Sequence, residues 1–160
     1  MISSSANAVS TRIFLGLVAG ALSMLLFHQT TLQLLYWIGL NSHPAFRLSV
    51  VAPFNVPMIV SITFWGAIFG AVVSAIVPRH LGSWLLRSAL AGLFVVLMAW
   101  FVVRPLAGHP AAFGWHSRSM ALSFTANIMW GFGFTLIQPI LSPRCLLSRS
   151  KAWAQHHLAT

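Results

Sequence analysis

The chain has 160 residues, 58% of them hydrophobic, and it carries nine Lys and Arg residues but no Asp or Glu. Because soluble proteins are about 25% charged, the 6% of charged residues here excludes a soluble domain and predicts a lipid-embedded protein. The missing carboxylates also exclude paired-carboxylate hydrolases, Ser-His-Asp triads and oxygen-ligand Ca²⁺ or Mg²⁺ sites, so we expect no enzyme activity.

Four apolar stretches are long enough to cross a bilayer core as helices, which takes about 20 residues each. They run from Ile13 to about Gln29, from Val56 to Val77, from about Trp84 to Val103, and from Ser119 to about Gln138. The sequence therefore predicts an all-α membrane protein with four transmembrane helices in a single integral membrane domain, 1–160. A cleaved signal peptide is the weaker interpretation of the first stretch, because no small-residue cleavage site follows Phe27.

The segment from Thr30 to Leu40 has two possible interpretations. It either prolongs the first helix or turns and lies in the membrane interface, which Tyr36 and Trp37 favour. Gln29 and Gln33 are one helical turn apart and would line a polar stripe on a continued helix.

Capping residues mark the expected helix starts. Asn55 is placed to cap the second helix, with Pro57 in its first turn. Ser83 is placed to cap the third helix, and either Ser117 or Ser119 the fourth.

Basic residues are more frequent on one side of the four predicted spans. Six fall on the side of both termini and of the 78–83 turn, and three on the other side: Arg12, Arg79, Arg87, Arg144, Arg149 and Lys151 against Arg47, Arg104 and Arg118. This asymmetry predicts that both termini are cytoplasmic. Anionic lipid head groups are the expected partners of these charges, at about 1 kcal/mol for each basic residue near the surface.

The last residues, 144–160, form a basic C-terminal tail with the only cysteine, Cys145. One cysteine excludes an intrachain disulfide, and we expect a free thiol rather than a palmitoylated one. The basic residues form no dense run, so the net charge of +9 does not indicate nucleic-acid binding.

The two halves of the sequence resemble each other. His43-Pro44-Ala45-Phe46 precedes the second span, and His109-Pro110-Ala111-Ala112-Phe113 precedes the fourth. Trp65-Gly66 and Trp130-Gly131 lie in the middle of those spans, and the odd spans begin alike after Arg12 and Arg87. We therefore expect two tandem helical hairpins, repeats 12–78 and 87–143, related by an axis along the membrane normal.

Small residues recur at helical spacing and predict where helices approach closely. They are Gly16, Gly20, Gly66, Gly70, Ser74, Gly92 and Gly131. Trp65 and Trp130 each precede one of these glycines, and core packing is a better explanation for them than a cofactor wall.

A few polar residues fall inside or beside the spans and are the candidate site residues: His28, Gln29, Gln33, Asn127 and Gln138. Hydrogen bonding between helices is their expected role. The histidines expected on the outer side would suit Zn or Cu if they converged, namely His28, His43, His109 and His116. They lack a carboxylate second shell, so we predict no metal and no cofactor.

The sequences Phe27-His28-Gln29 and Phe64-Trp65-Gly66 resemble those of small four-span bacterial inner-membrane proteins of unassigned role. This resemblance implies a bacterial cytoplasmic (inner) membrane and no particular activity. The leading expectation is a non-enzymatic subunit or scaffold that packs against other membrane proteins, or self-associates, in a multi-subunit complex. The alternatives are a small oligomeric channel or transporter, for which the positive charge favours anions, and a pocket for lipid, quinone or pigment.

Overall fold

The computed structural model describes residues 2–52, 55–77 and 82–142, with side chains from residue 9 onward. The predicted basic tail, the Cys145 thiol and four of the six basic residues behind the predicted orientation lie outside the described residues.

The first half of the described chain is one long helix, a short β-hairpin and a second helix. The long helix is continuous through α1 (Ile2–Ser23), the π-helical segment η1 (Met24–His28) and α2 (Gln29–Trp37). The hairpin pairs β1 (Val50–Val51) with β2 (Val56–Pro57), and α3 (Met58–Ile76) follows directly.

The second half again contains two long helices. The first of them is continuous through α4 (Trp84–Met98), the π-helical segment η2 (Ala99–Val103) and α5 (Arg104–Leu106). A short 3₁₀ segment, η3 (Ala111–Trp115), leads into α6 (Ser117–Ile140).

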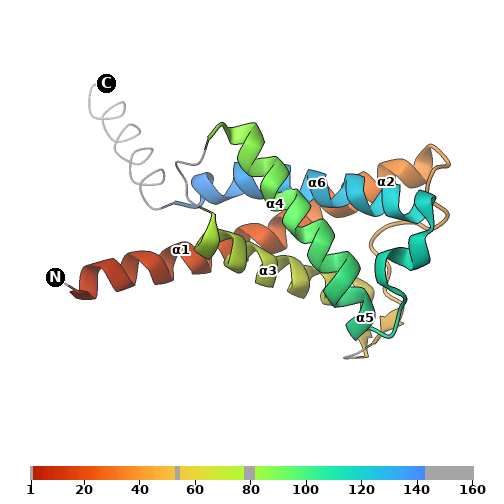
Figure 1. The fold of residues 1–160 in the computed structure, drawn as a ribbon, viewed down its shortest axis with the longest axis horizontal. Coiled ribbons are helices and arrows are strands. Elements are labelled where there is room, and N and C mark those ends of the chain that lie inside the picture. The colour runs from red at the N-terminus through yellow and green to blue at the C-terminus, as the bar shows by residue number, and fades with distance from the viewer. Residues whose placement is uncertain (1, 53–54, 78–81, 143–160) are drawn as a thin grey trace, which may run out of the picture.

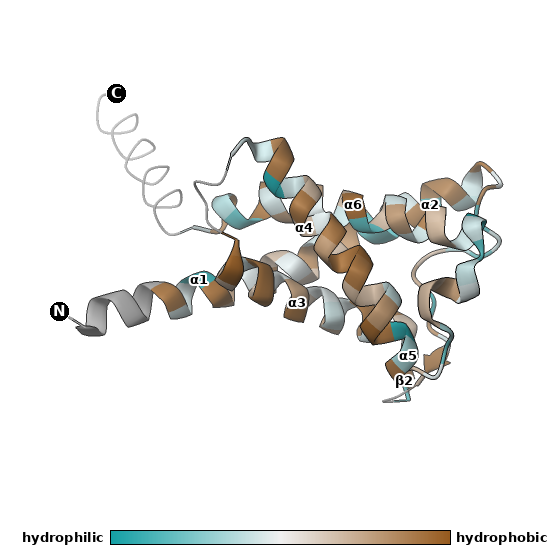
Figure 2. Cartoon of the chain, viewed as in Figure 1, coloured by the Kyte–Doolittle hydropathy of each residue, from teal (hydrophilic) through white to brown (hydrophobic). Residues whose placement is uncertain are grey.

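Four helices of the described chain are long and apolar enough to cross a membrane, as the sequence predicts: Val9–Trp37, Met58–Ile76, Trp84–Leu106 and Ser117–Ile140. The protein is therefore a mostly helical multi-pass membrane protein. Figure 2 shows hydrophobic residues along α3 and α4, with hydrophilic ones near both ends of α4.

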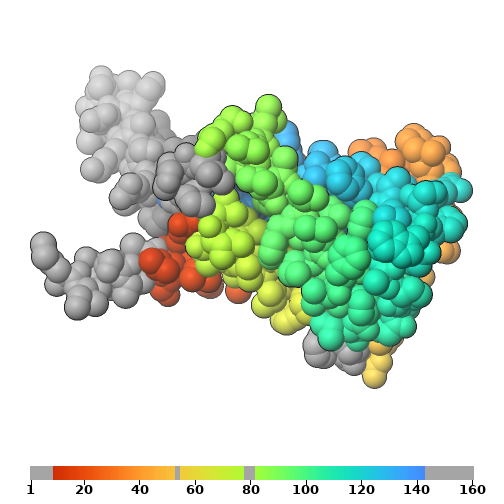
Figure 3. Space-filling model, in the orientation of Figure 1, coloured from red at the N-terminus to blue at the C-terminus, as the bar shows by residue number. Residues whose placement is uncertain are grey.

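The helices pack side by side in two antiparallel pairs (Figure 1). α1 packs along α3, α4 packs along α6, and α1 also contacts α6. α3 and α4 meet through longer side chains, for example Phe69 and Phe94, whose ring centroids are 6.2 Å apart. On the face shown in Figure 3, α4 lies across the molecule between α3 and α6.

The structure shows which interpretation of the segment after Thr30 is right, and it corrects two of the predicted helix caps. Residues 30–37 prolong the first helix as part of α2 and do not turn away from it. Ser83 caps α4 as predicted, by accepting a hydrogen bond from the Leu86 backbone N–H. Asn55 does not cap α3, because it adopts φ 51° and the helix begins after Pro57. The N-cap of α6 is His116, one residue before Ser117.

Candidate functional site

The tight packing of α1 against α3 depends on residues without a side chain at the crossing. An alanine Cβ at Gly70 would collide with the Gly16 carbonyl oxygen and with the Gly20 backbone. A Cβ at Gly20 would in turn collide with the Gly66 carbonyl oxygen. Such contact between backbones is what small-residue motifs provide in membrane helices.

α4 and α6 cross in the same manner. A Cβ at Gly131 would collide with the Ser88 carbonyl oxygen and the Gly92 backbone, as Gly70 does with α1. If Trp65 is aligned with Trp130, Gly131 corresponds to Gly66. In its contacts, however, Gly131 corresponds to Gly70, which lies one helical turn after Gly66. The hairpins therefore share a type of crossing but differ in how far one helix is shifted along the other.

The two aligned tryptophans lie in different environments. Trp130 is 0% exposed, and its indole N–H donates to the Gly20 carbonyl oxygen at 2.9 Å. Ser23 donates its hydroxyl to the Trp130 carbonyl oxygen at 2.6 Å, so α1 and α6 are joined in both directions. Trp65 is only partly buried and lines a cavity instead. Trp130 is thus a packing residue, and Trp65 alone is available as a cavity wall.

That cavity, which we call the central cavity, has a volume of about 120 Å³ and is lined by residues from all four spans, including Met24, His28, Trp65, Ala99, Val103 and Asn127. Met24 and His28 belong to η1, whereas Ala99 and Val103 belong to η2. Segments of π-helix are rare and are frequently found at functional sites. Their meeting here makes the central cavity the first candidate site.

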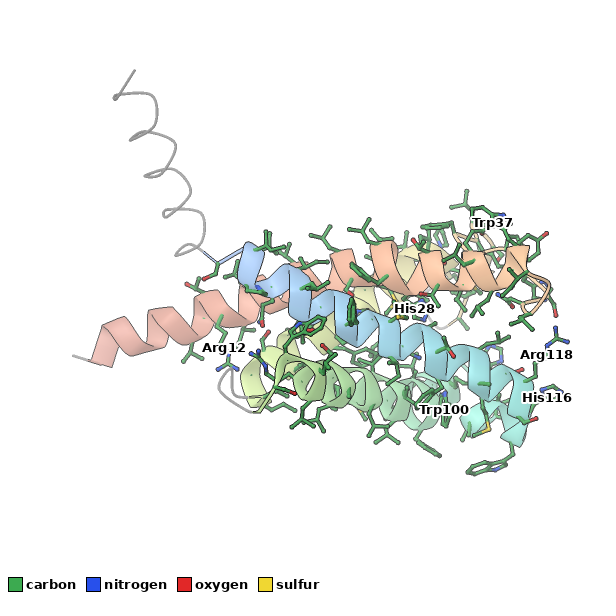
Figure 4. The ribbon with its side chains drawn as sticks, turned by 90° about the horizontal axis from the view of Figure 1, so that it is seen from above. Arg12, His28, Trp37, Trp100, His116 and Arg118 are labelled. Carbon is green, nitrogen blue, oxygen red and sulfur yellow. The ribbon has the colours of Figure 1, made fainter. Side chains whose placement is uncertain are left out.

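The polar groups of the central cavity make hydrogen bonds within α6, between η2 and α6, and within the first helix. Asn127 Nδ2 donates to the Ser123 carbonyl oxygen at 2.8 Å, and Trp100 Nε1 donates to Ser123 Oγ at 3.0 Å. His28 Nδ1 lies 3.3 Å from Gln29 Nε2. Figure 4 shows His28 and Trp100 in the middle part of the bundle, away from Arg12 at one end and Arg118 at the other.

The predicted polar stripe of Gln29 and Gln33 binds the first His-Pro loop. Gln33 Oε1 accepts from the Ala45 N–H at 2.9 Å, and Gln29 Oε1 accepts from the Phe46 N–H at 2.8 Å. The sequence predicts both glutamines as intramembrane polar residues but does not connect them to this loop, because nothing in their spacing identifies a partner 12 to 17 residues away.

The second His-Pro loop is held by an arginine instead. Arg104 Nε donates to the Pro110 carbonyl oxygen at 3.1 Å, and its guanidinium lies 3.7 Å from the centre of the Phe113 ring. The phenylalanines of both loops have left-handed backbones, with φ 56° at Phe46 and φ 58° at Phe113. The two loops therefore share a left-handed phenylalanine, but in the second loop it belongs to a run of left-handed residues from Ala112 to Trp115, and different side chains support the two loops.

A second cavity lies at the end of the bundle that holds Arg12, Val77 and Arg87, which we call the Arg12 end. This Arg87 cavity has a volume of about 160 Å³, and its polar lining comes from Ser74, Arg87, Thr135 and Gln138. Gln138 Nε2 donates to Ser74 Oγ, linking α6 to α3, and Arg12 donates to the Val77 carbonyl oxygen beside it. Sequence reasoning named Ser74 and Gln138 but not the cavity that they share with Arg87.

The predicted histidines are not gathered into a ligand set. Among the described residues, no three His, Cys or acidic side chains lie close enough together to hold a metal ion. His28 lines the central cavity, whereas His116 lies with Arg118 and Trp37 at the opposite end from Arg12 (Figure 4). We call this second end the Trp37 end.

Comparison with models of known protein families gives no match, and no curated protein or solved structure matches the chain.

Proposed function

We propose that the protein is a non-enzymatic subunit of a membrane complex that docks on another integral membrane protein through the exposed apolar residues that end its first helix, Trp37, Ile38 and Leu40. The observation that carries this proposal is the continuation of the first helix through α2. Val9–Trp37 has 29 residues, about 43 Å at 1.5 Å per residue, against about 30 Å for a bilayer core. α3 has 19 residues, which is about 28 Å.

The extra length places large apolar side chains at the end of the bundle. Trp37 is 70% exposed, and Ile38 and Leu40 are exposed beside it. This surface is held in place, because Arg118 donates from Nε and Nη2 to the Leu40 carbonyl oxygen and from Nη2 to that of Gly39. A fixed apolar surface suits a partner of the same chemistry.

The small-residue grooves contribute nothing to this proposal. The sequence predicts more of them than a four-helix bundle needs, but Gly16, Gly20, Gly70, Gly92 and Gly131 all contact a neighbouring helix of the same chain. A partner is thus expected at the apolar end of α2, which the second half of the chain lacks, and not along the grooves.

Trp115 provides a matched control, because it is also 70% exposed and follows the second His-Pro loop. A photo-crosslinking phenylalanine analogue would be placed at position 37 or 115 in native membranes. We expect a protein adduct, identified by mass spectrometry, from position 37 and little or none from 115. Equal crosslinking from both positions, or crosslinks to lipid alone, would contradict the proposal.

A second candidate function is binding of a small amphipathic ring or lipid segment in the central cavity, and the two π-helical segments that line it favour this. Its volume of about 120 Å³ approaches that of a cavity that holds benzene, about 150 Å³. His28 and Asn127 offer polar contacts within apolar walls. Mass spectrometry of extracts from the purified protein should find a bound ligand. Ala99→Leu should exclude this ligand by filling the cavity, whereas Ala89→Leu, on the exposed face of α4, should retain it.

We further propose that the Arg12 end faces the cytoplasm of a bacterial inner membrane and that the two hairpins arose by duplication. The duplication is supported by the two π-helical segments, each of which begins twelve residues after its arginine, Arg12 or Arg87. The left-handed Phe46 and Phe113 in the paired loops support it as well. On α6, the buried Trp130 lies between residues that line the central cavity and residues that line the cavity at the Arg12 end, so the two cavities do not form one pore through the chain. An anion channel or transporter therefore remains a prediction for an oligomer.

A further inference from the structure

The Arg87 cavity combines a positive side chain with several hydrogen-bonding groups at one end of the bundle. Ser74 comes from α3, Arg87 from α4, and Thr135 and Gln138 from α6. Three separate helices thus place polar side chains around a single space of about 160 Å³, which has room for several water-sized groups. Arg12 of the remaining helix donates to the Val77 carbonyl oxygen, and Val77 also lines the cavity.

The charge around this cavity is positive, and the chain itself supplies no acidic side chain to balance it. Arg87 and Arg12 are each partly buried, and the whole sequence contains no Asp or Glu. The lining thus combines one guanidinium with neutral hydrogen-bonding groups and contains no acidic side chain. Such a set of groups would attract an anion.

The chemistry of the lining selects among anions. A guanidinium offers a planar fork of donors that matches the oxygens of a phosphate group. Ser74 Oγ accepts from Gln138 Nε2, which leaves the serine hydroxyl hydrogen and the second amide hydrogen of Gln138 as donors. The Trp84 ring also lines the cavity, and tryptophan is enriched at the level of lipid head groups.

We propose that the Arg87 cavity is a binding site for a phosphate group, which an anionic phospholipid head group or free inorganic phosphate would supply. The site is independent of the docking surface proposed above, because it lies at the opposite end of the bundle (Figure 4).

The test uses the full chain purified in a nonionic detergent. Native mass spectrometry would measure binding of dioleoyl phosphatidylglycerol, with inorganic phosphate as a competitor. Zwitterionic dioleoyl phosphatidylcholine, whose phosphate is balanced by a choline cation, is the comparison without net charge. Arg87→Gln removes the charge while keeping hydrogen-bonding capacity. Arg47→Gln makes the same change in charge at another partly buried arginine, which directly follows the first His-Pro loop, and serves as the matched control.

We expect at least tenfold weaker phosphatidylglycerol binding in Arg87→Gln and less than a twofold change in Arg47→Gln. Displacement by millimolar phosphate would identify free phosphate as the ligand, and its failure would identify the lipid head group. Equal weakening in both variants, or none in either, would overturn the proposal. If Arg87→Gln fails to fold, Gln138→Leu and Ser74→Ala provide the same comparison, with threefold or greater weakening expected.

Discussion

The two helical hairpins of this protein use the same kind of crossing but give the same sequence motif different surroundings. α1 meets α3 at Gly16, Gly20 and Gly70, and α4 meets α6 at Ser88, Gly92 and Gly131. Trp130 packs against α1, where its indole N–H donates to the Gly20 carbonyl oxygen, and it is completely buried, while Trp65 lines the central cavity. The small-residue motif therefore fixes where two helices can approach, whereas contact with a third helix decides how far the neighbouring tryptophan is buried.

The loops at the Trp37 end show the same contrast. Both His-Pro loops place a phenylalanine in the left-handed region, Phe46 in one and Phe113 in the other. The first loop is held by glutamines on the helix that continues into α2, and the second by Arg104 on α5. The long first helix thus holds its loop with neutral glutamine side chains, whereas the second half holds its loop with the positively charged Arg104.

The largest expected effect comes from filling the two crossings. Gly70→Val and Gly131→Val should each destabilise the fold by about 3 kcal/mol, because the added atoms would meet backbone that cannot rotate away. Denaturant unfolding in mixed micelles, followed by circular dichroism, would measure both. Ala75→Val on the exposed face of α3 is the control, with a change under about 0.5 kcal/mol.

Similar losses at the two glycines would strengthen the comparison between the crossings. A loss at only one of them would show that one hairpin carries most of the stability, and the equivalence of the two would then be abandoned.

Substitution of the two tryptophans should change the stability of the fold by a smaller amount, and by a different amount in each hairpin. Trp130→Phe removes buried ring atoms and the hydrogen bond to the Gly20 carbonyl oxygen, so a loss of about 2 kcal/mol is expected. Trp65→Phe, at a partly buried cavity wall, should lose less than about 1 kcal/mol. The same unfolding measurement applies, and a larger loss at Trp65 would contradict the contrast between buried and cavity-lining positions.

The loop supports should give the smallest effect. Gln29→Leu removes the acceptor of the Phe46 N–H and should cost about 1 kcal/mol, seen as faster hydrogen exchange in residues 43–46. Arg104→Gln should speed exchange in residues 109–113 and leave the first loop unchanged. Faster exchange of both loops in either variant would mean that the loops are not supported separately.

The sequence alone determined the four spans and the helix start at Ser83, because a stretch of apolar residues and a local cap each depend on neighbours along the chain. It also identified the small residues of the crossings, since their spacing follows from the helical repeat. Whether residues 30–37 continue the first helix was open, because both interpretations suit an amphipathic segment with aromatic residues.

Only the tertiary structure decided which faces meet. The partners of Gln29 and Gln33, the burial of Trp130 in place of Trp65, and the gathering of Ser74, Arg87 and Gln138 around one cavity all depend on contacts between helices. The π-helical segments belong with these features, because neither is marked by a glycine or proline within it. The physical reason is that an apolar helix can pack on several faces with similar energy, and small differences in side-chain shape select the register.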